Sequence, residues 1–214
     1  MDESRALVSD PVLWPRVRDF LWDFAPQVHE SWLSDIPGLS ETAGNSGVFG
    51  NPRVKRYILD SLGVKPCFHF FPKDDGSRLL LLDGATLEST VKWLGALVCA
   101  DSLRLVTDGA TVRALKAALP GVYPEVFGYT AYFKSKVESL KVEGLKPNTV
   151  AVVGWMILRL SLSRLPESLM HRLSLKLPKD LEQQDFRPLT SDFQLSTLQL
   201  LLRLRFPEAY KICC

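Results

Sequence analysis

An apolar run from Val150 to Leu158 dominates the pattern of this chain, and a second apolar stretch follows it closely. Pro166 separates the two stretches, and proline suits the first turn of a helix because it has no N–H to donate there. Leu165, Leu169 and Leu173 then recur every four residues, which is the spacing of one buried helix face. The pattern predicts two packed helices, each with an apolar face that must be covered.

The leucine spacing changes at the end of this second stretch. Leu173, Leu175 and Leu177 alternate with polar residues, and a period of two is typical of an extended segment. We therefore expect the helix to give way to an extended exit. The region Gly154–Leu173 is expected to form the centre of the core, where truncation of a leucine would be costly.

Most other segments also favour helices, so the fold is expected to be mainly α. Helical spacing is clear over Val12–Phe24, Arg53–Leu62 and Ser191–Arg205. Aromatic and apolar residues over Cys67–Phe71 and Arg78–Asp83 suit two short paired strands, and a small β-hairpin is expected near residues 67–83.

The length of the chain sets its expected domain organisation. A chain of 214 residues with 46% hydrophobic content can bury a substantial core. We expect one compact helical domain over 1–214, with N-terminal helices and a loop in 1–63 and a helical core in 64–214. The loop Ser40–Pro52 contains three evenly spaced glycines, but without the strand, helix and Lys-Ser/Thr pair of a phosphate loop it is interpreted as mobile surface.

A short sequence occurs twice and predicts two helix starts. Asp83-Gly84-Ala85-Thr86 is repeated as Asp108-Gly109-Ala110-Thr111, and each copy precedes an amphipathic run. Asp and Thr side chains accept hydrogen bonds from the unpaired N–H groups of a first helical turn. Two copies are too few for a solenoid, so we interpret them as reuse of the same start chemistry.

Charge and hydropathy limit the classes of partner. The formal net charge of +2 arises from 26 basic and 24 acidic residues, which argues against a nucleic-acid partner. The longest apolar run would span about 14 Å as a helix, against about 30 Å of membrane hydrocarbon. No signal peptide is apparent in the first residues. A cytoplasmic location is expected.

The residue types that carry chemistry do not form a recognisable site in the sequence. His29, His69 and His171 lie outside nucleophile motifs and outside the paired spacings of zinc ligands. No catalytic residue, metal site or cofactor is predicted. Cys67 and Cys99 are expected to be buried free thiols, and the terminal pair Cys213-Cys214 a frayed, reactive tail.

Three stretches carry a resemblance to a known family. An apolar helix, a proline-bearing turn and a second helix lead to "HRLSLKLP" (171–178); upstream lies "VKWLGALVCADSLRLV" (91–106), and downstream "STLQLLLRLRFPEAY" (196–210). In this order they resemble the C-terminal half of the SctK family (YscK, PscK) of type III secretion accessory proteins. The resemblance covers residues 86–214, and the first 80 residues match only loosely.

The resemblance implies a function. Proteins of the SctK family are cytoplasmic, non-enzymatic adaptors of the type III secretion sorting platform. The resemblance therefore implies contact with the cytoplasmic domain of the inner-membrane ring protein SctD and with the pod protein SctQ. Such a protein would lie at the cytoplasmic face of the inner membrane through its partners alone.

An adaptor must expose side chains that anchor its partners, and two groups of residues are candidates. The basic segment near the end of the HRLSLKLP stretch is expected to face one partner, because these cations would be costly to bury unpaired. The N-terminal tryptophans are candidate aromatic anchors. The six predicted partner-binding residues are Arg172, Lys176, Lys179, Trp14, Trp22 and Trp32.

Two other classes of function stay open on the residues alone. One is an enzyme with a site assembled from dispersed residues, such as His29 or His69 with an aspartate. The other is a small-ligand binding module that uses Trp93 and Trp155. Ligand-dependent stabilisation would distinguish these classes from an adaptor.

Overall fold

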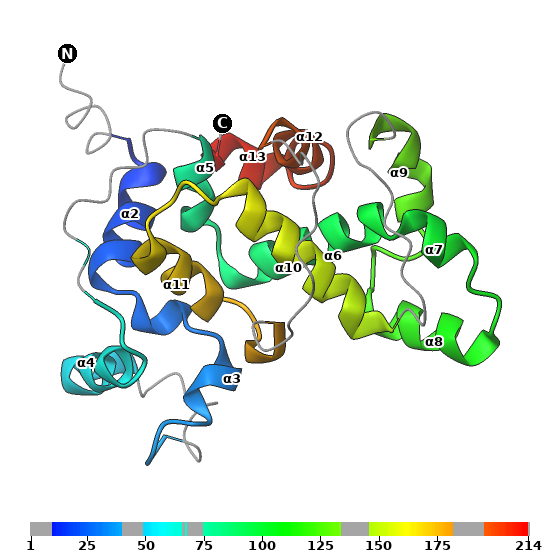
Figure 1. The fold of residues 1–214 in the computed structure, drawn as a ribbon. Coiled ribbons are helices and arrows are strands. Elements are labelled where there is room, and N and C mark those ends of the chain that lie inside the picture. The colour runs from blue at the N-terminus through cyan, green and yellow to red at the C-terminus, as the bar shows by residue number, and fades with distance from the viewer. Residues whose placement is uncertain are drawn as a thin grey trace. The chain divides into compact units, whose positions relative to one another are not determined.

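Every regular element in the described part of the chain is a helix, as the mainly α prediction requires (Figure 1). The computed structural model describes residues 10–39, 49–65, 67, 75–133, 146–181 and 195–213. The α-helices are α2 (Leu13–Trp22), α3 (Glu30–Leu33), α4 (Pro52–Ser61), α5 (Asp75–Arg78), α6 (Gly84–Val98), α7 (Ala100–Arg104), α8 (Gly109–Ala118), α9 (Val126–Phe133), α10 (Pro147–Ser161), α11 (Glu167–Leu175), α12 (Leu195–Arg205) and α13 (Pro207–Cys213). The 3₁₀ helices are η1 (Ala25–Gln27), η3 (Leu79–Leu81) and η4 (Lys179–Leu181).

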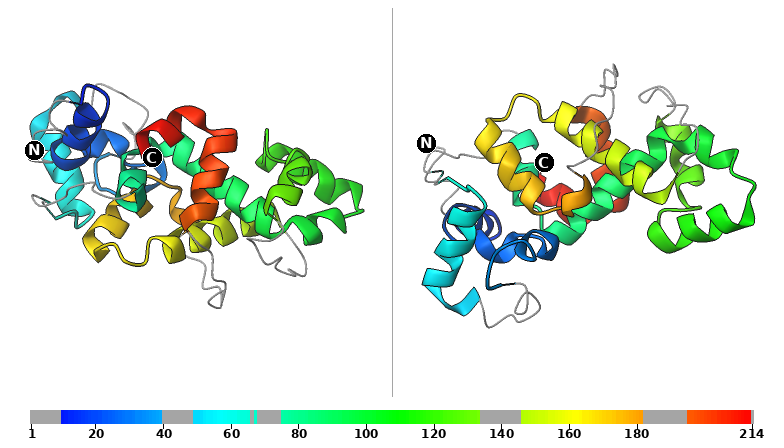
Figure 2. Two further views of the ribbon diagram at one scale, coloured as in Figure 1. Left: turned by 90° about the horizontal axis from the view of Figure 1, so that it is seen from above. Right: turned by 60° about the horizontal axis from the view of Figure 1, so that its bottom comes forward.

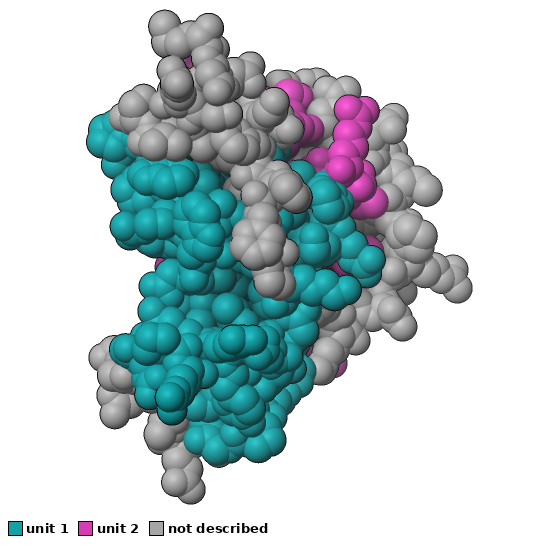
Figure 3. Space-filling model, turned by 90° about the vertical axis from the view of Figure 1, so that its left-hand side faces the viewer, with its two compact units in different colours: residues 1–84, 165–179, 208–214 teal, residues 85–164, 180–207 magenta. Residues whose placement is uncertain are grey.

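The chain forms two compact units, which Figure 3 distinguishes by colour. Unit 1 consists of residues 1–84, 165–179 and 208–214, and unit 2 consists of residues 85–164 and 180–207. Each unit therefore combines segments that are distant in the sequence. The predicted central region Gly154–Leu173 is divided between them, and it supplies buried leucines to both units.

Unit 1 shows that the second strand of the expected hairpin is wrong. Residues 75–78 form α5 and residues 79–81 form η3. Most of the first expected strand lies outside the described residues. The four leucines Leu79–Leu82 are all buried, and a short run that is apolar on every side has no periodicity to separate strand from helix.

The expected extended exit after Leu173 is also wrong. Helix α11 continues to Leu175, and Lys176 follows with helical dihedrals. Every residue of 172–177 is buried, which removes the difference between an inward and an outward face. The alternation of Leu with Ser and Lys therefore reflects burial on all sides of a helix end rather than a strand.

Unit 2 contains a close crossing of α6 and α10, which run side by side in Figures 1 and 2. Gly95 on α6 meets Gly154 on α10 at the point of contact. A Cβ atom built on Gly95 would lie 1.8 Å from the Val150 carbonyl oxygen, and one built on Gly154 would lie 1.8 Å from the Val91 carbonyl oxygen. The two backbones touch because neither glycine has a side chain.

The repeated Asp-Gly-Ala-Thr sequence marks two helix starts, as predicted. Helix α6 begins at Gly84 and α8 begins at Gly109. In the second copy the Asp108 carboxylate accepts hydrogen bonds from the Thr111 N–H and hydroxyl, both at 2.7 Å. These bonds lower the pKa of Asp108 below its ordinary value of 3.8. They also satisfy a first-turn N–H that has no partner within the helix.

Candidate functional site

Helix α11 carries the basic residues that the sequence places at a partner surface. Its leucine face is buried as predicted, with Leu169 and Leu173 in the core of unit 1. The helix begins after Pro166, which has an extended backbone and occupies the N-cap position. The structure then turns two of the three predicted basic anchors into the interior of the unit.

Arg172 is buried inside unit 1, with 3% of its surface exposed. Its Nη1 donates to the Phe20 carbonyl oxygen at 2.5 Å, and its Nη2 donates to the Lys65 carbonyl oxygen at 2.9 Å. The guanidinium lies 5.5 Å from the ring centre of Phe20 and 5.1 Å from that of Phe24. Burial lowers the pKa of Arg172 below its ordinary value, although its interaction with Cys67 acts in the opposite direction. Arginine remains charged in proteins, so a full charge is buried here.

Lys176 is buried still more completely, with 1% of its surface exposed. Its Nζ donates to the carbonyl oxygens of Leu80 and Leu82 at 2.7 and 2.9 Å. The same nitrogen lies 5.1 Å from the ring centre of Phe20 and 5.9 Å from that of Phe24. Burial lowers the pKa of Lys176 from 10.5 to about 7, because water no longer stabilises the charged form.

Three of the four carbonyl acceptors of these bonds lie at the ends of helical segments, and the fourth, that of Lys65, lies in the loop after α4. Phe20 belongs to the last turn of α2, and Leu80 and Leu82 close η3. His171 adds a further case, because its Nε2 lies 2.8 Å from the carbonyl oxygen of Leu62, the residue that ends α4. The last carbonyls of a helix lack partners within it and carry partial negative charge. Helix α11 therefore supplies donors to the C-terminal ends of α2, η3 and α4.

The expectation that Arg172 and Lys176 face solvent is therefore wrong. Both were expected outside because an unpaired buried cation is costly, but backbone carbonyls and aromatic rings surround them here. Carbonyl acceptors leave no mark in a charge pattern, so the sequence could not show this pairing. A folded unit 1 keeps both side chains from any docking partner.

Lys179 and Trp32 are brought together near the end of the same segment. The Lys179 ammonium pairs with Asp35 and lies 5.7 Å from the ring centre of Trp32. The Trp32 Nε1 donates to the Leu177 carbonyl oxygen at 2.9 Å. Both side chains are half-buried, so each contributes to the fold and retains some accessible surface. Partner contact by either residue stays a prediction.

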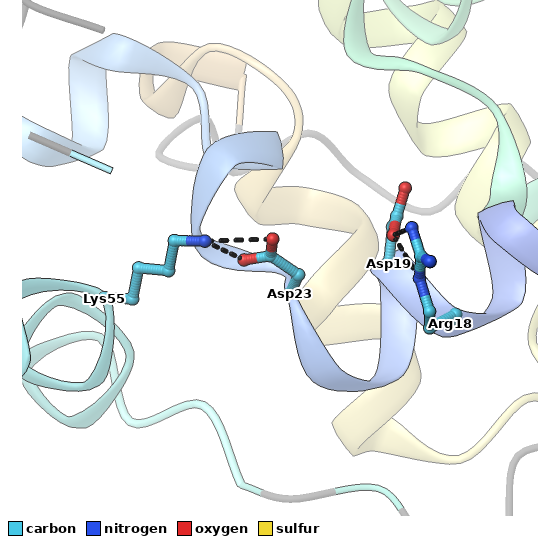
Figure 4. A network of polar contacts seen from close by, with 4 residues as sticks. All are labelled: Arg18, Asp19, Asp23 and Lys55. Carbon is cyan, nitrogen blue, oxygen red and sulfur yellow. Dashed lines mark hydrogen bonds and ion pairs between the residues drawn. The ribbon is translucent and has the colours of Figure 1, made fainter. Parts of the chain in front are cut away.

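Trp14 and Trp22 form the most exposed aromatic feature among the predicted residues. They lie on α2 with ring centres 5.9 Å apart in an edge-to-face arrangement, and 58% of Trp22 is exposed. We call this pair the tryptophan face. Figure 4 shows two salt bridges at this helix. Arg18 pairs with Asp19 on α2, and Asp23, which follows α2, pairs with Lys55 of α4. Partner contact by the tryptophan face also stays a prediction.

The described histidines have structural contacts. His29 occupies the N-cap of α3, where its Nδ1 accepts from the Ser31 N–H at 3.2 Å. His171 holds the end of α4, as described above. His69 lies outside the described residues, as does most of the loop 40–52. The described part of the chain holds no group of three or more His, Cys, Asp or Glu residues arranged to bind a metal ion.

The cysteine expectations are correct for only one residue. Cys99 is buried, and burial raises the pKa of its thiol from 9.0 to about 12. Cys67 is half-exposed rather than buried. Cys213 is not a frayed tail, because it lies in α13 with 1% of its surface exposed. Cys214 lies outside the described residues.

None of the helices in the described ranges has both the length and the apolar composition needed to cross a membrane. The unpartnered polar atoms in these ranges are few and scattered. The buried side-chain nitrogens without a described hydrogen-bond partner are Trp155 Nε1, Arg172 Nε and Arg205 Nε. These nitrogens come from three different helices, α10, α11 and α12.

Comparison with known proteins identifies a family but no individual relative. The family model described as YOP proteins translocation protein K (YscK) matches residues 20–122. No curated protein and no solved structure matches the chain. This match covers the N-terminal region, in which the sequence motifs resemble the family only loosely. It overlaps the resemblance predicted for residues 86–214 only in residues 86–122. The resemblance to the SctK family of type III secretion proteins is confirmed, because residues 20–122 match the model of this family.

Proposed function

We propose that this protein is a non-enzymatic, cytoplasmic adaptor of the type III secretion sorting platform. It links an SctD-like inner-membrane ring protein to an SctQ-like pod protein. The observation that carries the proposal is the match of residues 20–122 to the YscK family. The resemblance of the later stretches to the same family supports it, because those stretches extend almost to the C-terminus.

The division into two units suits an adaptor, which needs two separate surfaces. Residues 20–84 of the matched region belong to unit 1, and residues 85–122 belong to unit 2. Each unit has its own buried core and its own exposed aromatic residues. Trp22 in unit 1 is 58% exposed, and Tyr132 in unit 2 is 62% exposed.

The tryptophan face is the surface that we assign to one of the two partners. Tryptophan and arginine are enriched among residues that dominate the binding energy of protein interfaces. Trp14 and Trp22 lie together, and the exposed Arg18 side chain falls between them in the sequence of the same helix. A pair of adjacent indole rings offers a large, rigid contact area at low entropic cost.

The test is co-expression of the full chain with the SctQ-like protein and, separately, with the SctD-like cytoplasmic domain. The wild-type chain is expected to co-purify with both. The double variant Trp14→Ala/Trp22→Ala is expected to lose about tenfold or more in affinity for one partner and to retain the other. Tyr132→Ala is the matched control for the partner that the double variant loses, because it removes an equally exposed aromatic side chain from unit 2 and is expected to leave that partner bound.

The outcomes separate the adaptor from its assigned surface. Capture of neither partner by the folded wild-type chain would overturn the adaptor proposal. Capture of both partners by the folded double variant would leave the adaptor in place and reject the tryptophan face. Far-UV circular dichroism establishes that each variant is folded before its binding is measured.

A further inference from the structure

Lys176 differs from an ordinary buried cation in the chemistry of its contacts. Its two described hydrogen-bond acceptors are neutral carbonyl oxygens, those of Leu80 and Leu82. The rings of Phe20 and Phe24 also lie close to this nitrogen. A neutral amine has two N–H groups, which match these two acceptors, whereas an ammonium group has a third N–H and a charge to stabilise. The geometry therefore accommodates the neutral side chain without loss of either hydrogen bond.

The charged groups around Lys176 act on it in opposite directions. Asp83, which precedes α6, favours the charged form of Lys176, while Arg16 on α2 and Arg172 on α11 disfavour it. Arg16 itself reaches the Leu81 carbonyl oxygen at 3.4 Å, so it approaches the same helix end. Burial is the largest influence, and it brings the pKa of Lys176 to about 7.

We propose that Lys176 is a pH-sensitive element of unit 1, which stabilises the unit as a neutral amine and loosens it as a buried ammonium. Helix α2 carries both Phe20, which contacts Lys176, and the exposed tryptophan face. The protonation state of Lys176 thus acts on the helix that presents this face. The inference about stability does not depend on the proposed function.

The direction of the effect follows from proton linkage. In the unfolded chain the lysine keeps its proton up to pH 10.5, whereas in the folded unit it loses the proton at about pH 7. Between these two pH values unfolding takes up one proton. The ratio of folded to unfolded chain therefore increases by about tenfold for each unit by which the pH rises. Below about pH 7 both states are protonated, and this gain in stability is absent.

The first test measures the titration directly in the full-length folded chain. The chain is labelled with ¹³C at lysine Cε, and the Lys176 signal is assigned through its connection to the backbone. Its chemical shift is expected to titrate with a midpoint near pH 7. A midpoint above pH 10 would overturn the proposal, and this measurement requires no substitution at Lys176.

The second test compares the stability of variants by urea unfolding at pH 6, 7, 8 and 9. The variants are Lys176→Met, which keeps an unbranched apolar chain, and Lys179→Met, which removes a half-buried lysine at a nearby position. The ratio of unfolding constants between wild type and Lys176→Met is expected to change by up to about tenfold per pH unit above pH 7. The unfolding constant of Lys179→Met is expected to change with pH in the same way as that of the wild type.

The second test also has an outcome that contradicts the proposal. If the unfolding constants of Lys176→Met and wild type change with pH in the same way, Lys176 is not the source of the pH dependence of stability. If Lys176→Met does not fold, the titration midpoint of the wild-type lysine decides the question alone.

Discussion

Replacement of Gly95 by alanine tests the close crossing of α6 and α10. In a helix with free space, Gly→Ala stabilises by about 1 kcal/mol, because alanine has the higher helix propensity. At Gly95 the new Cβ would lie 1.8 Å from the Val150 carbonyl oxygen and 2.8 Å from the carbonyl carbon. Both of these atoms belong to the backbone, so no change of rotamer can relieve the overlap.

The size of the effect can be worked out from the distances. Ordinary contacts of a Cβ atom begin at 3.4 Å, so the two helices must separate by about 1.6 Å at this point. Separation would loosen the buried faces on both helices, including Val91 and Leu94 on α6. Overpacking of a core costs about 1–3 kcal/mol and occasionally more. We expect Gly95→Ala to destabilise unit 2 by about 3 kcal/mol or more, despite its gain in propensity.

The assay is urea unfolding followed by far-UV circular dichroism and by tryptophan fluorescence, since Trp93 and Trp155 are both buried in unit 2. Gly128→Ala in α9 is the matched control, because a Cβ there would meet nothing within 4 Å. Gly128→Ala is expected to leave the free energy of unfolding unchanged or to raise it by up to about 1 kcal/mol. If Gly95→Ala is as stable as Gly128→Ala, the two backbones do not touch and the reasoning is wrong.

Two further predictions concern one residue in each unit. Leu169→Ala should destabilise unit 1 by about 2–5 kcal/mol because it leaves a cavity under α11, and an unchanged thermal midpoint would remove Leu169 from the core. Asp108→Ala should destabilise α8 at neutral pH by removing its N-cap. The pKa of Asp108 in the folded chain lies below its ordinary value of 3.8. The cap therefore stabilises the folded chain above pH 3.8, and this stabilisation is lost as the pH falls through the folded pKa. Wild type and variant should therefore converge in stability in strong acid, and a constant difference down to the lowest pH would contradict the cap.

Local patterns predicted most of the helices because their signals lie within a few residues. The spacing of apolar residues over Val12–Phe24 and Arg53–Leu62 is borne out by α2 and α4. The Asp-Gly-Ala-Thr copies are borne out as helix starts, since an N-cap depends on hydrogen bonds that span only three residues. Periodicity failed at Leu79–Leu82 and at the end of α11, where residues are buried on every side.

The sequence by itself determined the mainly α class, the helix starts and the leucine face of α11, because backbone sterics and apolar spacing act locally. Only the tertiary structure decided the environment of Arg172 and Lys176. Their acceptors, the carbonyls of Phe20, Lys65, Leu80 and Leu82, lie about 90 to 150 residues away, and every residue type carries such a carbonyl. A basic side chain that donates to backbone therefore has no complementary partner in the sequence, and its position inside or outside the fold is fixed only when distant segments come together.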